Sequence, residues 1–279
     1  MSLLPGGLIR AQQRRRDFKL ARPRGEIDMR LHGGLAESSS HPRWISDALS
    51  MVLDELAGEA PTPDAVAELC VADRQFLAVQ WRLACSADPN QPAWFNAQCQ
   101  ACDSPYDFAI NWRDLPFKPA GEGFPIAELP LSCGTARIKV PDGDVQTVLA
   151  EHPDPIVPDL WVALLLVQSI NGEPVTDPTT LALSEEDVGL IEDRVEALSP
   201  ELGLVMQTRC PECQAEQKVE LDPYANLARP VDALLHDIHL LARCYHWSEA
   251  AILDLPAQRR RHYLTLIDQD RGRHWQEAE

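Results

Sequence analysis

Apolar residues recur every three or four positions in the first third of the chain, which predicts amphipathic helices. The first predicted helix covers residues 42–56 and ends near Gly58. Its apolar positions are Ile45, Leu49, Val52, Leu53 and Leu56. A second apolar pattern over residues 66–84 predicts further helix in two pieces, with Asp73 as the N-cap between them. These helices are expected to supply packing surface.

Strict alternation of apolar and polar residues predicts β-strands in the middle of the chain. Over residues 106–112, one face carries Tyr106, Phe108, Ile110 and Trp112, and the other carries Asp107, Ala109 and Asn111. Residues 136–140 alternate in the same way and end at a turn over residues 141–144. A short apolar run over residues 202–206 precedes another predicted strand at residues 219–221.

Helical patterns return between and after these strands. They cover residues 145–150, 160–169, 184–198 and 231–245, and two further helices begin at Ser248 and Pro256. Ser184 and Asp187 have the S-x-x-D spacing of a helix start. The C-terminal part is therefore predicted to consist of three helical pieces with short connections.

Two windows, residues 73–116 and 184–227, show the same order of features at an offset of 111 residues. Each has a helix start, a proline-containing break, an apolar run, a C-x-x-C motif and an alternating strand. The motifs are Cys99-Gln-Ala-Cys102 and Cys210-Pro-Glu-Cys213, whose first cysteines align without a gap. The pattern indicates an internal duplication, with coincidence as the alternative because the sequence identity is low.

The paired cysteines have the spacing of zinc ligands. A C-x-x-C turn presents two thiolates to one metal ion, and tetrahedral Zn²⁺ needs four ligands. The two motifs are much farther apart than the ~15–20 residues of an ordinary zinc ribbon. We therefore predict a split zinc ribbon, in which the two halves hold one Zn²⁺ through Cys99, Cys102, Cys210 and Cys213. Four cysteine ligands leave no position for water, so the site is predicted to be structural.

Two alternatives for the motifs stay open. A C-x-x-C pair also serves thiol-disulfide exchange, although that chemistry uses one pair at a helix start, whereas both pairs here precede strands. The other alternative is an eroded ribbon that no longer holds metal. The remaining cysteines are predicted to be ordinary buried residues: Cys70, Cys85, Cys133 and Cys244.

Charge is distributed unevenly along the 279 residues, which include 43 acidic and 25 basic residues for a net charge of −18. Residues 1–24 carry seven basic residues and one acidic residue, so that +6 precedes a remainder of −24. This composition predicts a flexible arm over residues 1–40 that docks on an acidic surface through Arg14, Arg15 and Arg16. A solvated tail or a misassigned start is the alternative. The acidic remainder argues against nucleic acid as the main partner.

The sequence excludes several broad classes. Its longest apolar stretch, over residues 160–167, is far shorter than the ~20 residues of a membrane span, and the expectation is a cytoplasmic protein. The G-x-S-x-G, P-loop and G-x-G-x-x-G motifs are absent, so we expect no enzyme. His236 and His239 lie three residues apart but have no acidic third ligand at the spacing of a metalloprotease motif.

The predicted fold class is α+β, with two duplicated helix–zinc-knuckle–strand units and a C-terminal helical region. The predicted divisions are the basic arm at 1–40, the first unit at 41–118, a β-containing central connection at 119–160, the second unit at 161–228 and the helical region at 229–279.

Short motifs resemble the T4-type baseplate hub assembly proteins of contractile-tailed phages and related injection systems. The first is Ala72-Asp73-Arg74-Gln75-Phe76-Leu77, followed by helix to Arg82, the first C-x-x-C with its strand, and Leu115-Pro116. The others are Tyr245-His246-Trp247-Ser248-Glu249, Ile252-Leu253-Asp254-Leu255-Pro256 and Arg259-Arg260-Arg261-His262-Tyr263-Leu264. The resemblance touches residues 73–116 and 184–267; the basic arm has no match, and the second knuckle is less aromatic than the first.

This resemblance implies a non-enzymatic role, either in assembling the baseplate of a contractile tail or injection system or as part of it. Its implied partners are baseplate or tail proteins, with no small-molecule substrate and no membrane. Aromatic residues beside arginines are typical of interfaces, so partner contacts are expected at Trp247, Arg259, Arg260, Arg261 and Tyr263. The alternative is a helical hairpin packed on its own core with solvated arginines. Alternative functions are a zinc-ribbon regulator that binds nucleic acid through the arm, and a thiol oxidoreductase.

Overall fold

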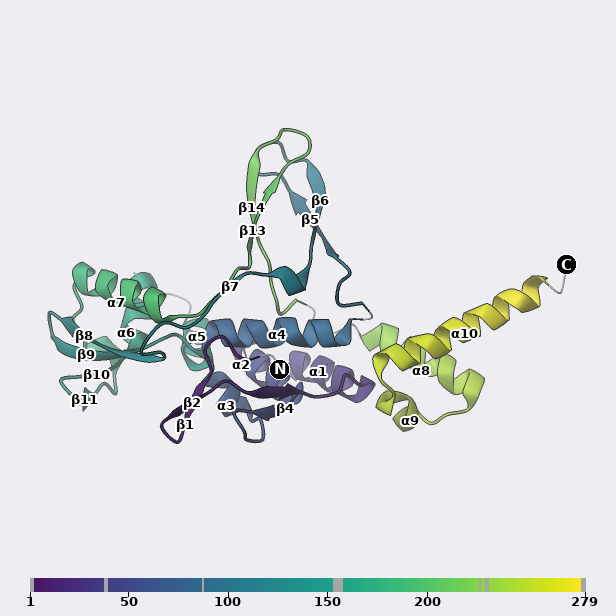
Figure 1. The fold of residues 1–279 in the computed structure, drawn as a ribbon, viewed down its shortest axis with the longest axis horizontal. Coiled ribbons are helices and arrows are strands. Elements are labelled where there is room, and N and C mark those ends of the chain that lie inside the picture. The colour runs from purple at the N-terminus through teal and green to yellow at the C-terminus, as the bar shows by residue number, and fades with distance from the viewer. Residues whose placement is uncertain are drawn as a thin grey trace.

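The computed structural model describes residues 3–37, 40–86, 88–152, 158–225, 227–228 and 231–276. These residues form an elongated, mixed α and β structure, with a central body, a lobe at one end, helices at the other and a projection from the middle (Figure 1). Ten α-helices and several small antiparallel sheets lie in the described ranges. None of the helices described there is both long and apolar enough to span a bilayer.

The central body consists of the N-terminal strands and the first four helices. These are β1 (Leu8–Arg10), β2 (Gln13–Arg15), β3 (Phe18–Leu20), α1 (Gly25–Glu37), α2 (His41–Met51), β4 (Leu53–Leu56), α3 (Pro63–Ala67) and α4 (Val71–Cys85). Their apolar residues share one core, which includes the buried side chains of Trp44, Leu49 and Trp81. Helix formation predicted over residues 66–84 is confirmed in two pieces.

The helix predicted over residues 42–56 is wrong beyond Met51. Residues Leu53–Leu56 form β4, which pairs antiparallel with β3, and the two end residues of β4 are buried. A strand that buries its first and fourth residues has the same three-residue spacing as one turn of a helix. The apolar pattern therefore could not separate the two structures at this place.

The N-terminal segment is folded onto the body, so the prediction of a flexible arm over residues 1–40 is wrong for its described part, residues 3–37. Strand β1 pairs with β2, and β3 pairs with β4. Leu4 and Leu8 are buried in the core of the body. These apolar anchors explain why a segment with high positive charge is ordered.

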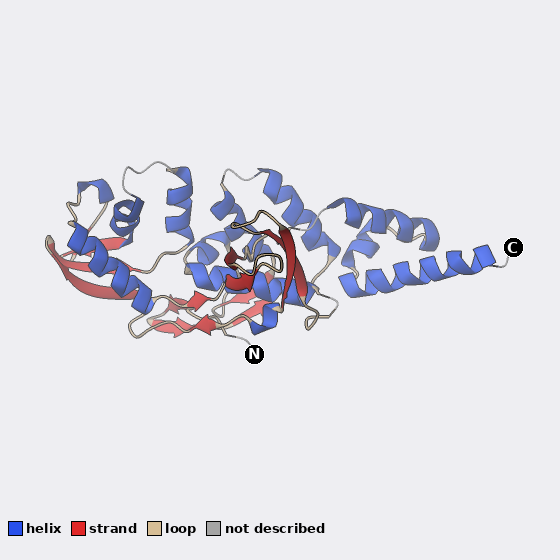
Figure 2. Ribbon diagram, turned by 90° about the horizontal axis from the view of Figure 1, so that it is seen from above, coloured by secondary structure: helices blue, strands red, loops and turns tan. Residues whose placement is uncertain are grey.

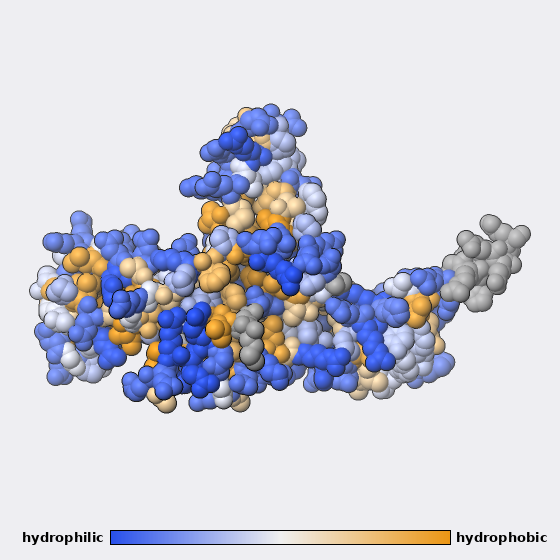
Figure 3. All heavy atoms as spheres, in the orientation of Figure 1, coloured by the Kyte–Doolittle hydropathy of each residue, from blue (hydrophilic) through white to orange (hydrophobic). Residues whose placement is uncertain are grey.

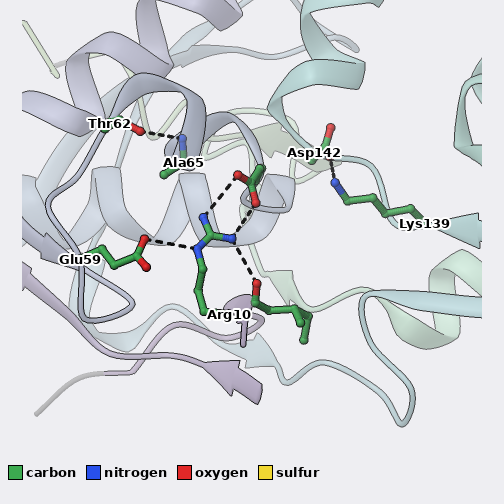
Figure 4. A network of polar contacts seen from close by, with 8 residues as sticks. Arg10, Glu59, Thr62, Ala65, Lys139 and Asp142 are labelled. Atoms are coloured by element: carbon green, nitrogen blue, oxygen red, sulfur yellow. Dashed lines mark hydrogen bonds and ion pairs between the residues drawn. The ribbon is translucent and has the colours of Figure 1, made fainter. Parts of the chain in front are cut away.

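Acidic residues of the same chain neutralise part of this positive charge. An Nη atom of Arg10 lies 2.8 Å from a carboxylate oxygen of Glu68, and its Nε lies 3.7 Å from Glu59 (Figure 4). Lys19 lies 3.6 Å from Asp54. The basic segment thus docks on acidic residues of its own body.

The three arginines expected to bind a partner also have contacts within the chain. Arg14 donates from Nε to the carbonyl of Gly6 at 2.6 Å, and Arg16 donates from Nε to the carbonyl of Leu4 at 2.5 Å. Arg15 is exposed and pairs with Asp17 at 2.8 Å. Arg14 and Arg16 therefore fasten the N-terminal loop, while Arg14 and Arg15 stay exposed, so a partner contact at these arginines stays a prediction.

Two charged residues at the start of α4 are completely buried. Asp73 is not the N-cap, because Cys70 occupies that position. Instead, the Asp73 carboxylate accepts hydrogen bonds from the backbone N–H groups of Gly6 and Gly7, at 2.7 and 2.6 Å. Its neighbour Arg74 donates to α2 and to α3. These polar contacts connect the N-terminal loop and three helices.

The lobe contains a four-stranded antiparallel sheet in the order β11-β10-β9-β8, with helices on one side (Figure 1). Its elements are β8 (Ile126–Leu131), β9 (Gly134–Lys139), α5 (Gly143–Glu151), α6 (Pro158–Leu166), β10 (Val167–Ile170), β11 (Glu173–Pro174) and α7 (Glu185–Leu198). The strand predicted over residues 136–140 and the capping box of Ser184 and Asp187 are confirmed. The helix predicted over 160–169 ends at Leu166, where β10 begins.

The lobe core crosses the predicted division between residues 160 and 161. Ile138 and Val140, from the predicted central connection, pack in one cluster with Leu166 and Ile191. Helix α7 contacts β8, whereas α4, its counterpart in the proposed duplication, packs in the central body. The two halves therefore differ in the surroundings of their helices.

The three C-terminal helices are α8 (Val231–Tyr245), α9 (Glu249–Asp254) and α10 (Ala257–Gln276). They confirm the three predicted pieces and extend from the body at the end opposite the lobe (Figures 1 and 2). Ser248 caps α9 by accepting a hydrogen bond from the N–H of Ala251. Arg24 joins this region to the start of α1 through an ion pair with Asp254 at 2.7 Å.

Candidate metal centre

Two β-hairpins from distant parts of the chain form the projection (Figure 1). The first joins β5 (Ala93–Gln98) to β6 (Pro105–Ile110), and the second joins β13 (Val205–Arg209) to β14 (Glu216–Glu220). Alternation along β6 is confirmed, since Tyr106 is buried and Asp107 is exposed. The first hairpin is followed by a 3₁₀ turn at Trp112–Asp114 and by the short strand β7 (Phe117–Lys118). Strand β7 pairs with β12 (Glu201–Leu202), which precedes the second hairpin. A second 3₁₀ turn, at Pro178–Thr180, belongs to the lobe.

The base of the projection is an apolar core on α4. Buried Val79 of α4 packs in one cluster with Trp112, Leu204 and Leu221. Phe95 of the first hairpin stacks on Phe108 with ring centroids 5.6 Å apart. Apolar residues gather where the projection joins the body, whereas the visible surface of its far half is mostly hydrophilic (Figure 3). At the far end the two hairpins share a small buried cluster of Cys99, Tyr106 and Cys210.

The two cysteine turns have the same backbone geometry. In the first, the N–H of Cys99 donates to the carbonyl of Ser104 at 3.0 Å, and the N–H of Asp103 donates to the carbonyl of Cys99 at 2.9 Å. In the second, the corresponding bonds join Cys210 to Ala215 and Gln214 to Cys210, at 3.0 and 2.9 Å. Asp103 and Gln214 both have positive φ, 57° and 62°. The predicted equivalence of the two motifs is confirmed at this local level.

The tip of the projection brings the four predicted ligands together. Their sulfur atoms all lie within 4.8 Å of one another: Cys99, Cys102, Cys210 and Cys213. The Sγ atoms of Cys99 and Cys213 are 3.6 Å apart, and those of Cys102 and Cys210 are 3.7 Å apart. Among the described residues, this is the one group of three or more Cys, His, Asp or Glu side chains placed to hold a metal ion. We call it the four-cysteine cluster.

The two motifs of the four-cysteine cluster show the same pattern of burial. Cys99 and Cys210, the first residues of the two motifs, are completely buried, whereas Cys102 and Cys213 are exposed. The same position in each motif is thus buried or exposed in the same way.

Two contacts between the hairpins do not involve sulfur. The hydroxyl groups of Tyr106 and Thr208 are 2.7 Å apart, and the N–H of Gln100 donates to the side-chain carbonyl of Gln217 at 3.0 Å. The sequence did not predict these two contacts. Gln217 is buried on the face that also carries Val219 and Leu221. A polar residue at an inward strand position needs a hydrogen-bond partner, and this was the one signal in the sequence for such a contact.

The close thiols affect one another's ionisation. Hydrogen bonds from Ser104 lower the pKa of Cys102 to about 6. A backbone hydrogen bond from Ala215 favours the thiolate of Cys213, but contacts with Cys102 and the other thiols, together with desolvation, raise its pKa to about 12. Cys102 and Cys213 therefore favour one negative charge between them at neutral pH, and a bound cation would favour the thiolate form of both.

The other predicted partner residues lie in the C-terminal region. Trp247 and Tyr263 pack together in its apolar cluster, with ring centroids 4.9 Å apart. Arg259 and Arg261 are exposed, and Arg259 lies over the Tyr263 ring at 5.8 Å. Arg260 is 3% exposed, donates to the carbonyl of Leu255 at 2.7 Å and lies 3.4 Å from Asp28. The expectation of a partner contact at Arg260 is wrong, because its guanidinium group faces inward.

The four remaining cysteines do not join the cluster. Cys70 and Cys85 are buried, as predicted, whereas Cys133 is partly buried and Cys244 is exposed, which corrects the prediction for these two.

Comparison of the chain with protein-family models, with curated protein sequences and with solved structures gives no match.

Proposed function

We propose that the four-cysteine cluster holds one structural Zn²⁺ ion and that the two hairpins form a split zinc ribbon. The sulfur geometry carries this proposal. Four sulfurs around a tetrahedral zinc ion, each bonded at about 2.3 Å, lie about 3.8 Å from one another. The cross-hairpin distances of 3.6 and 3.7 Å are close to that spacing. The donor set also fits, because thiolates suit zinc.

A structural role follows from the coordination. Four thiolates complete the tetrahedral shell of Zn²⁺ and leave no position for a reacting water molecule. Isolated two-stranded hairpins are marginally stable in water, and metal binding supplies folding free energy where a small core does not. Zinc would join the hairpins at the tip, at the end opposite the apolar core on α4.

Metal analysis of the full-length chain tests this centre. Protein purified under reducing conditions is expected to contain about one zinc ion per chain by mass spectrometry, in keeping with one four-cysteine site. Removal by a strong chelator is expected to weaken the ordering of the hairpins, measured by hydrogen exchange at residues 93–110 and 205–220. A chain with no bound metal, or one whose hairpin exchange does not change with the chelator, would contradict the proposal. Stoichiometric binding of iron instead would contradict the assignment to zinc.

The protein is further proposed to be a non-enzymatic assembly factor or structural component of the baseplate of a contractile tail or injection system. The resemblance of residues 73–116 and 184–267 to baseplate hub assembly proteins supports this role. The assignment of four cysteines to a structural metal also agrees with a protein that acts through binding. Its partners would be baseplate or tail proteins, met during assembly in the cytoplasm.

Affinity capture tests this role. The tagged full-length chain, expressed in the cells that carry its gene, is expected to recover baseplate or tail proteins. The matched control is the chain with Arg259→Glu and Arg261→Glu, two exposed arginines in the predicted contact region, and it is expected to recover less. Recovery of none of these proteins by the unaltered chain would contradict the role.

Two assays distinguish the alternative functions. Salt-sensitive retardation of DNA or RNA would favour the nucleic-acid regulator, which the internal pairing of Arg10 and Arg15 disfavours. Alkylation-sensitive reduction of insulin would favour the oxidoreductase, which the position of both motifs before strands disfavours.

A further inference from the structure

Two sulfur–sulfur contacts in the four-cysteine cluster, at 3.6 and 3.7 Å, cross from one hairpin to the other. Cys99 contacts Cys213, and Cys102 contacts Cys210. Each pair also combines one buried cysteine with one exposed cysteine. An oxidant from solvent would therefore meet Cys102 or Cys213 first, with a buried cysteine of the other hairpin close to the sulfur it attacks.

We infer, on the basis of the proposed zinc centre, that hydrogen peroxide converts the cluster into two disulfides across the hairpins, Cys99–Cys213 and Cys102–Cys210, with release of zinc. The hairpins would then be joined covalently in the oxidised protein and by metal in the reduced protein. The projection would keep its arrangement in both redox states.

The reaction balances with peroxide as the oxidant. The exposed thiolate attacks one peroxide oxygen, the O–O bond breaks, hydroxide leaves and the cysteine becomes a sulfenic acid. The buried thiolate of the opposite hairpin attacks that sulfur, the S–O bond breaks and a second hydroxide leaves as the disulfide forms. Two such events oxidise four thiolates by four electrons and reduce two peroxide molecules. Together with four protons, they yield two disulfides, Zn²⁺ and four water molecules.

Contacts other than those of the cysteines hold the two hairpins together while zinc leaves. The Tyr106–Thr208 contact and the Gln100–Gln217 hydrogen bond join them without using sulfur. The apolar core on α4 holds their other ends. These contacts keep the sulfurs of opposite hairpins close together during the two oxidation steps.

Peptide mapping of the zinc-loaded, full-length chain tests the inference. Trypsin leaves both cysteines of the first motif in residues 83–113, together with the buried Cys85, and both of the second in residues 210–218. After treatment with two equivalents of peroxide, we expect release of the bound zinc to a chromogenic chelator and recovery of these two peptides as one disulfide-linked species. Fragmentation between the cysteines of each peptide is expected to give the 99–213 and 102–210 pairing.

Several outcomes would overturn the inference. They are recovery of the two peptides separately with a disulfide inside each motif, the other cross-hairpin pairing, sulfinic acids in place of disulfides, and retention of zinc. Cys244→Ser, which removes an exposed cysteine outside the cluster, is the matched control and is expected to give the same peptide map as the unaltered chain. The zinc content before oxidation separates the two proposals. A chain without zinc would contradict the proposed metal centre. A zinc-loaded chain that gives another oxidation product would contradict only the inferred oxidation.

Discussion

The Sγ atom of Cys99 lies 3.6 Å from the Sγ atom of Cys213, although 114 residues separate them in the chain. A contact between the first cysteine of one knuckle and the second cysteine of the other requires the two hairpins to face each other. Neither hairpin alone supplies the four thiolates of a tetrahedral zinc site. The proposed metal centre therefore depends on the fold that brings both hairpins onto α4.

Replacement of one ligand from either hairpin is expected to remove the metal. Cys99→Ser and Cys210→Ser should each lower zinc from about one ion per chain to a small fraction of that, and should lower solubility, because the loss of one of four thiolates opens the coordination shell. Zinc content by mass spectrometry and the soluble fraction on expression measure these effects. Cys133 packs against the lobe core, away from the cluster, so the Cys133→Ser variant should keep the zinc content of the unaltered chain. Zinc near one ion per chain in either ligand variant would refute a shared site.

The cysteine turns were predictable from the sequence because their geometry is local. A C-x-x-C motif sets the spacing of two sulfurs within one turn, whatever the rest of the chain does. The contacts of Gln217 and Thr208 were not predictable, because they depend on how one hairpin is rotated against the other. Chain spacing carries no information about that rotation.

Arg74 is expected to be essential for the stability of the central body. Its guanidinium group is buried and donates to Ser46 at 2.8 Å, to the carbonyl of Val66 at 3.1 Å and to that of Pro42 at 2.9 Å. Arg74→Met keeps much of the side-chain volume but removes three hydrogen bonds of a buried charged group, so we expect a loss of about 2–4 kcal/mol. Urea unfolding followed by tryptophan fluorescence measures it, since two tryptophans lie in the same core.

Arg113→Met provides the matched control for Arg74→Met. Arg113 is exposed and donates to Asn90 at the surface. Its replacement is expected to leave the urea midpoint unchanged. Equal effects of the two substitutions would show that the buried contacts of Arg74 contribute little.

Asp187 is expected to make the stability of the lobe depend on pH. Its carboxylate accepts hydrogen bonds from Ser132 and Ser184, and those from Ser132 contribute most to lowering its pKa below the usual range. A lowered pKa in the folded state contributes stability above the unfolded pKa of about 4, and this contribution is lost as the pH falls below it. Asp187→Ala should therefore cost at least the ~1 kcal/mol of a helix cap at pH 7, and less near pH 2. Thermal unfolding at both pH values measures the difference, and a constant difference would contradict this linkage.

Elements with strong local signals were predicted correctly, and elements determined by distant contacts were not. The capping box of Ser184 and the alternation around Ile138 were sufficient to place α7 and β9. For residues 53–56, pairing with β3 decided between strand and helix, and β3 lies more than 30 residues earlier. The basic N-terminal segment shows the same limit, because net charge does not tell where the opposite charges are located.

The N-terminal segment provides a test of burial against charge. Leu4 is completely buried in the core of the body, so Leu4→Ala is expected to destabilise the protein by about 2–5 kcal/mol through the lost apolar contact and the cavity it leaves. Arg15→Ala removes an exposed ion pair with Asp17 and is expected to leave the unfolding midpoint unchanged, because exposed pairs contribute little. Urea unfolding compares the two variants with the unaltered chain. A solvated tail would make both substitutions neutral, whereas an arm fixed by its charges would make Arg15→Ala the more damaging; the burial of Leu4 predicts the opposite order.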